Sequence, residues 1–129
     1  MAKDYSTMTV RELEELRVVM LERIAAVPAF RRGSLQVGYR KCGSANCRCA
    51  RPGELGHGPR GLWTRTAKGP GGSRGQYIPI ASVEQVRAEL DNYAAFAALI
   101  EDYVEVNEAL CKAHLGPPAR RGRRADAAT

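Results

Sequence analysis

The stretch from residue 39 to residue 59, YRKCGSANCRCARPGELGHGP, decides how the rest of the chain can fold. It holds three of the four cysteines, Cys42, Cys47 and Cys49, and one of the two histidines, His57. Zinc binds through thiolates and imidazole, and four such ligands complete a tetrahedral structural site. The order Cys42-x4-Cys47-x-Cys49-x7-His57 places four ligands within 16 residues, among glycines that permit tight turns. The pattern predicts a structural Zn²⁺ site that holds this loop together.

Two other interpretations of the cysteine stretch stay open. The spacing differs from the paired C-x2-C motifs of common zinc ribbons, and C-x-C requires an irregular backbone to turn both thiols toward one metal. The cysteines could instead be reduced loop residues with His57 as a hydrogen-bonding neighbour, or they could serve an iron–sulfur or redox role.

One helix is predicted on each side of this stretch. Thr9 and Glu12 have the spacing of a capping box, and Pro28 ends the helix that follows, so we expect a helix over residues 9–27. Residues 83–114 contain neither Gly nor Pro, and Gly116 with two prolines stops them, which predicts one long helix. The first helix has apolar residues at helical spacing: Leu13, Leu16, Met20, Ile24 and Val27.

The long helix carries more apolar surface than one short partner helix can cover. Its main stripe consists of Val83, Val86, Leu90, Tyr93, Ala97, Ile100, Val104, Asn107, Cys111 and His114. A second stripe consists of Phe96, Leu99, Tyr103, Val106 and Leu110. The first helix can cover one stripe, so we predict a homodimer through the helices. Cys111 is expected to be a small core residue and not a metal ligand.

Between the helices the sequence favours short strands. Residues 34–39 read as an extended piece, and residues 61–68 and 74–80 as a β-hairpin around the turn GPGGS at 69–73. We therefore predict an α+β fold in a single domain of residues 1–115. It comprises the 9–27 helix, a basic Cys/His loop and hairpin over 31–80, and the 83–114 helix. Residues 116–129 are predicted to form a disordered basic tail.

The charges are strongly segregated along the chain. Residues 31–74 carry ten Lys or Arg and one acid, Glu54, whereas residues 75–115 carry two basic and seven acidic residues. Such a basic segment predicts contacts with nucleic-acid phosphates, with Tyr39, Trp63 or Tyr77 available for stacking. The alternative is a solvated basic face that neutralises the acidic helices. The predicted phosphate contacts are Arg31, Arg32, Arg40, Lys41, Arg48, Arg51, Arg60, Arg65, Lys68 and Arg74.

Several function classes are disfavoured by the sequence. The N-terminus lacks the apolar segment of a signal peptide, and no apolar run approaches the roughly 20 residues of a membrane span, so we expect a cytoplasmic protein with reduced thiols and no membrane partner. A Cys–His nucleophile would need one cysteine free of metal beside His57 and a third, orienting group. Because Glu54 is the one acid between residues 31 and 83, we predict that the protein is not an enzyme.

Four short motifs carry a resemblance to a known family. They are Arg32-Gly33-Ser34-Leu35, Cys42-Gly43-x3-Cys47-x-Cys49, Gly56-His57-Gly58-Pro59 and Tyr77-Ile78-Pro79. Together with the long C-terminal helix, they resemble a family of small, uncharacterised bacterial proteins, over residues 31–110. That family is a domain of unknown function, so the resemblance implies the shared motif but no activity. From the residues themselves we predict a zinc-stabilised nucleic-acid-binding module, and its rival is a protein–protein adaptor that uses the long helix.

Overall fold

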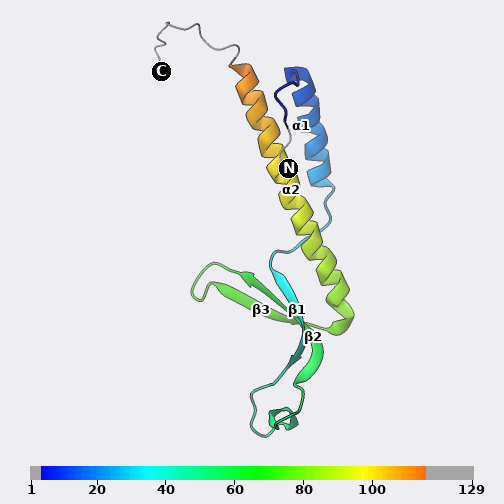
Figure 1. Cartoon of the computed structure of the whole chain (residues 1–129), viewed down its shortest axis with the longest axis vertical. Helices are drawn as coiled ribbons and strands as arrows, with labels where there is room; N and C mark the ends of the chain where they lie inside the picture. The colour runs from blue at the N-terminus through cyan, green and yellow to red at the C-terminus, as the bar shows by residue number, and fades with distance from the viewer. Residues whose placement is uncertain (1–3, 116–129) are drawn as a thin grey trace. The chain divides into compact units, whose positions relative to one another are not determined.

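The computed structural model describes residues 4–115, and the chain divides into two compact units (Figure 1). The helical unit contains residues 4–26 and 96–115, and the sheet unit contains residues 27–95. The elements are α1 (Val10–Ala25), β1 (Ser34–Arg40), β2 (His57–Thr66), β3 (Ser73–Ile78) and α2 (Val83–His114), with 3₁₀ turns at Arg48–Ala50 and Ile80–Ser82. This confirms the predicted α+β class. The predicted tail at 116–129 lies outside the described residues, and the single domain over 1–115 stays a prediction.

Helix α1 begins at the capping box that the sequence indicates. The Thr9 hydroxyl accepts from the Glu12 amide at 3.1 Å, and the Glu12 carboxylate accepts from the Thr9 amide at 2.9 Å. The helix ends at Ala25 with Ala26 as its cap, slightly before the predicted residue 27, because the residue preceding Pro28 is disfavoured in helical geometry.

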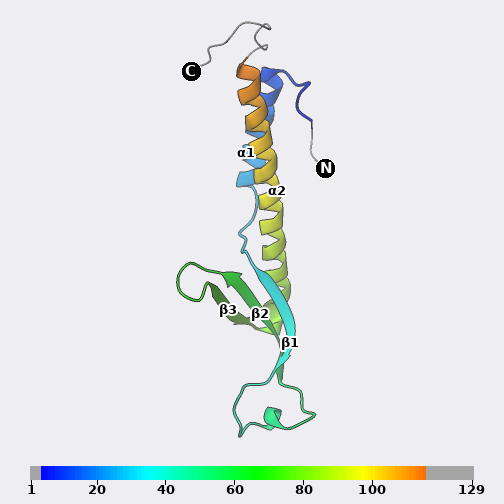
Figure 2. The same cartoon turned by 60° about the vertical axis from the view of Figure 1, so that its left-hand side comes forward.

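Helix α1 lies along the C-terminal half of α2 within the helical unit (Figure 2). Leu13 and Met20 of α1 form a buried core with Val106 and Leu110 of α2, and Leu13 and Val106 are almost completely enclosed. The second predicted stripe of α2 is therefore the one that α1 covers.

The main predicted stripe is left partly open at its C-terminal end. Val104 is 42% exposed and Cys111 is exposed, so the expectation that Cys111 is a core residue is wrong. The physical reason is that α1 packs on Val106 and Leu110, which places Cys111 on a neighbouring flank of α2. Asn107 accepts a 2.8 Å hydrogen bond from Arg17 Nε of α1 and donates to its own helix at the Tyr103 carbonyl.

The sheet has the strand order β1-β2-β3, with both pairs antiparallel. The hairpin of β2 and β3 was predicted; the extended piece at 34–39 becomes a third strand that pairs with β2. One face of the sheet packs on the start of α2 around Ile78, Val83 and Val86. Gly61 lies in this contact, where an added Cβ would meet Val83 at 3.3 Å. The face that carries Gln36, Leu62 and Tyr77 points away from this core, since side chains alternate along a strand.

Within residues 4–115, none of the helices combines the length and apolar character that crossing a membrane requires.

Candidate metal centre

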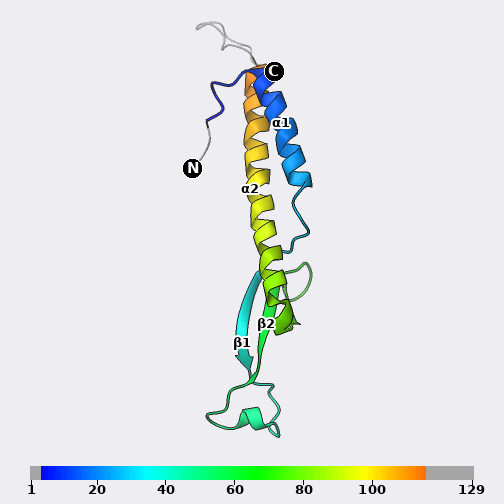
Figure 3. The same ribbon diagram turned by 90° about the vertical axis from the view of Figure 1, so that its right-hand side faces the viewer.

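Three of the predicted ligands, Cys42, Cys47 and Cys49, lie in the loop that joins β1 to β2, and His57 is the first residue of β2. This loop, residues 41–56, extends beyond the paired ends of the two strands and contains the short 3₁₀ turn at Arg48–Ala50 (Figure 3). Cys47 caps the turn in an extended conformation, and Cys49 lies within it. The abrupt change from extended to 3₁₀ backbone allows both thiols of the C-x-C pair to face the same point, which a regular strand would prevent.

All four predicted ligands converge. One ligand atom each from Cys42, Cys47, Cys49 and His57 lies within 4.8 Å of the others. Cys47 Sγ is 3.3 Å from His57 Nε2, and Cys49 Sγ is 3.5 Å from Cys42 Sγ. A tetrahedral ion with bonds of about 2.3 Å to sulfur would separate two sulfurs by about 3.8 Å. The spacing therefore fits a small tetrahedral metal ion, and 3.5 Å is far longer than a disulfide bond.

The electrostatics of the loop favour a thiolate at Cys42. A hydrogen bond from the Ser44 backbone, followed by those from His57, Cys49 and Cys47, lowers the pKa of Cys42 to about 6. Cys49 is buried and accepts a 3.3 Å hydrogen bond from the Cys42 amide, which favours its thiolate. Burial and the neighbouring Cys47 and Cys42 thiols outweigh that bond and raise the pKa of Cys49. Because a metal must bind thiolates, a dication would resolve this crowding by neutralising the adjacent sulfurs.

Gly56 allows the loop to close directly before His57. A Cβ at this position would collide with the backbone of Arg40, the residue that pairs with His57 across the strands. The missing side chain thus permits the close approach of β1 and β2 that positions His57 beside the three thiols. Gly58 serves the same approach, because an added Cβ there would meet the Gly38 carbonyl oxygen at 2.6 Å. Gly43 and Gly53 have open space around them and a positive φ, as turns require.

Residues 10–88 match a protein family described as Domain of unknown function (DUF6788), over more than half of the chain. The chain belongs to this family. No curated protein and no solved structure matches it. The expected resemblance to a domain of unknown function is thus confirmed, and membership of DUF6788 brings no activity with it.

The predicted basic contacts of this DUF6788 protein lie at both ends of the sheet and differ in their partners. Arg48 Nε lies 3.0 Å from the Glu54 carboxylate and stays largely exposed, and Lys41 Nζ donates to the Arg51 carbonyl at 3.2 Å. Within residues 4–115, Arg31 and Arg48 have carboxylate partners, and the other eight predicted phosphate contacts have none.

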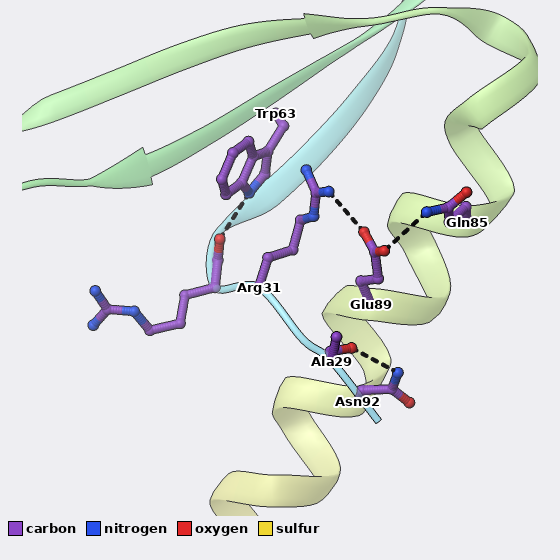
Figure 4. Close-up of polar contacts among 7 residues, drawn as sticks. Ala29, Arg31, Trp63, Gln85, Glu89 and Asn92 are labelled. Carbon is purple, nitrogen blue, oxygen red and sulfur yellow. Dashed lines mark hydrogen bonds and ion pairs between the residues drawn. The ribbon is translucent and has the colours of Figure 1, made fainter. Parts of the chain in front are cut away.

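Arg31 is engaged inside the sheet unit (Figure 4). Its guanidinium lies 2.7 Å from the Glu89 carboxylate of α2 and 4.5 Å from the centre of the Trp63 ring. Glu89 also accepts from Gln85, and the Trp63 indole donates to the Arg32 carbonyl at 2.7 Å. These contacts attach the segment before β1 to α2, so Trp63 and Arg31 contribute to the fold of this unit.

A second group of residues gathers on the open face of the sheet, and sequence reasoning named its members without connecting them. Arg60 lies over the ring of Tyr77, with 3.7 Å between the guanidinium carbon and the ring centre. The two residues are 17 positions apart, and the strand register brings them together. No signal short of the correct register could have paired them.

Proposed function

We propose that this protein is a zinc-stabilised nucleic-acid-binding module without enzymatic activity. The observation that carries the proposal is the placement of charge. Ten basic residues lie in one segment around the Cys/His cluster, and eight of them have no carboxylate partner within residues 4–115. Guanidinium and ammonium groups that are not neutralised within the fold are suited to phosphate oxygens.

Zinc is the ion that the donor set favours. Three thiolates and one imidazole suit a borderline-soft ion with no geometric preference beyond four ligands, and the distances are close to tetrahedral. The sheet unit buries few large side chains, chiefly Ile78, Val83 and Val86, so a metal would stabilise a loop that contributes Cys49 alone to the buried residues. Metal-binding thiols must stay reduced, which is why we also propose a cytoplasmic location.

The lack of catalysis is inferred from the same geometry. The three loop thiols and His57 all converge on one place. No single thiol is therefore placed as a nucleophile with His57 as its base. Glu54, the acid closest in sequence, is paired with Arg48. The residues that an enzyme would use are thus the ones that a metal would occupy.

We also propose a homodimer through the helices. Val104 on α2 and Val18 on α1 are 42% and 53% exposed, and Val19 and Leu21 of α1 are exposed as well. A second copy would cover this apolar surface with the same surface of its own. Sedimentation equilibrium at micromolar concentration should give twice the monomer mass, and a monomer would exclude the dimer.

Binding of labelled single-stranded and duplex oligonucleotides, followed by fluorescence anisotropy at several salt concentrations, tests the main proposal. Replacement of Arg32, Arg51 and Lys68 by glutamine should weaken binding and reduce the slope of log K against log salt by about 2, since each phosphate contact contributes about 0.7–0.9. The matched control replaces three arginines outside the basic segment, Arg11, Arg23 and Arg87, with the same loss of charge. An equal effect of both triple variants, or no binding of either oligonucleotide at low salt, would refute the proposal.

A further inference from the structure

The open face of the sheet contains a groove that the candidate metal centre does not use. Its volume is about 480 Å³, within the range of small-molecule sites. It is lined by residues of all three strands, among them Tyr39 and Arg40 of β1, Arg60 of β2 and Tyr77 of β3. The groove lies entirely within the sheet unit, on the face opposite to the core around Ile78.

The two charged side chains of the groove, Arg40 and Arg60, are both cationic. Neither Arg40 nor Arg60 has a carboxylate partner within the described residues. The Nε of Arg60 is buried, and no described group accepts a hydrogen bond from it. A buried donor without an acceptor is costly in a folded protein and calls for an explanation. A bound ligand could explain it, because a small rotation of the guanidinium would bring this donor to an acceptor on the ligand.

The two aromatic side chains of the groove are accessible. Tyr39 and Tyr77 are each 48% exposed. The register shift between Gly38 and Arg40 releases Tyr39 from regular pairing and presents both Tyr39 and Arg40 to the groove. Arg60 lies against Tyr77, so the groove offers a stacked guanidinium and ring beside a second aromatic side chain.

A ligand that matches these groups needs a planar π-system and a negative charge close to it. A nucleotide has both, and bases stack on aromatic rings and on guanidinium planes. In a duplex the faces of each base are covered by its neighbours, so only an unpaired base can enter such a groove. Trp63 is not an alternative platform, because it packs in the core on the other face and its indole is bonded to Arg32.

We propose that this groove binds single-stranded nucleic acid, with an unpaired base stacked on the Arg60–Tyr77 pair and Arg40 at an adjoining phosphate. The inference rests on the proposed function and adds the class of nucleic acid and the binding site. The metal centre would have a supporting role, because the loop that it closes runs directly from Arg40 to the strand partner of Arg40, His57.

The test measures the affinity of the full chain for single-stranded and duplex oligonucleotides of the same sequence. The parent should bind the single strand more tightly, and Tyr77→Thr should weaken that binding roughly 5- to 150-fold, the effect of losing one stacked base. Tyr77→Phe should rescue the affinity lost in Tyr77→Thr, since it retains the ring. The control Gln76→Thr changes an exposed neighbour in the same strand whose side chain points to the opposite face, and should leave binding as in the parent.

A measurement on the unaltered chain covers the case in which Tyr77→Thr does not fold. Photocrosslinking of a single strand that contains 5-bromouracil should modify peptides that include Tyr77 or Tyr39. If duplex binds as tightly as single strand and the crosslinks fall elsewhere, the groove is not the site, while the proposed function stands. If neither oligonucleotide binds, both proposals fail.

Discussion

The ion pair between Arg31 and Glu89 links the segment before β1 to α2. Its coupling free energy should be larger than that of an ordinary surface ion pair. We consider the variants Arg31→Met, Glu89→Gln and their combination. The side chains are 26% and 19% exposed, and their charged atoms lie 2.7 Å apart. Methionine retains much of the alkyl contact with Trp63, and glutamine retains the shape of Glu89, so the cycle isolates the charges.

The magnitude follows from the distance and the burial. At an effective dielectric constant of about 20, two unit charges 2.7 Å apart attract by about 6 kcal/mol, and the loss of hydration offsets most of this. We expect each single variant to lose about 2 kcal/mol of unfolding free energy, and the coupling energy to be about 1–2 kcal/mol. With a urea dependence of about 1–3 kcal/mol per molar, a loss of 2 kcal/mol lowers the midpoint by roughly 1 M.

Urea unfolding followed by tryptophan fluorescence is the appropriate assay. Trp63 is the single tryptophan of the chain, and its ring is 4.5 Å from the Arg31 guanidinium. The pair Arg11–Glu15 serves as the control. Its side chains are 88% and 66% exposed and its charged atoms lie 3.4 Å apart, so its coupling energy should be about 0.3–0.5 kcal/mol. A coupling for Arg31 and Glu89 no larger than that of the control would refute the reasoning. Folded Arg31→Met protein should also keep the parent's slope of log K against log salt in nucleic-acid binding, because the Arg31 guanidinium of the parent is already paired with Glu89.

Three further outcomes are expected from the metal loop and the helical core. Zinc should protect Cys42 from iodoacetamide while Cys111 stays reactive. In metal-free protein the rate of Cys42 alkylation should rise with pH to a plateau with its midpoint near pH 6, because the lowered pKa of Cys42 gives the reactive thiolate above that pH. Gly56→Ala should abolish retention of zinc after gel filtration, since the added methyl collides with β1, whereas Gly38→Ala, which has open space, should retain one equivalent. Leu13→Ala should cost about 2–5 kcal/mol in the helical transition seen by circular dichroism, because Leu13 is 1% exposed, and a cost below 1 kcal/mol would show that this core is loosely packed.

The parts of the structure that could be predicted are those encoded by local signals. The capping box at Thr9, the absence of Gly and Pro from 83–114, and the turn residues between β2 and β3 each specify their element within a few positions. The four residues of the candidate metal centre could be named because cysteine and histidine are uncommon and these four lie within 16 residues.

The parts that could not be predicted depend on partners that are distant in sequence. Cys111 shares its spacing with the apolar stripe of α2, and only the position of α1 decides that it is exposed. Arg31 looks like any other member of the basic segment, and its partner Glu89 lies 58 residues away. The Arg60–Tyr77 stack likewise follows from strand register, which composition and periodicity do not specify.

The packing of α1 has a consequence for how this family can vary. The matched segment, residues 10–88, contains Leu13 and Met20, whereas Val106 and Leu110, which enclose them, lie beyond it. A shortened chain ending at residue 88 would leave α1 with its apolar side facing water. Any relative that keeps α1 must therefore supply a covering surface from sequence outside the shared segment. Substitutions at Leu13 should be accompanied by compensating changes at the position of Val106, so the two ends of the chain should evolve together although the recognisable family signature includes only one of them.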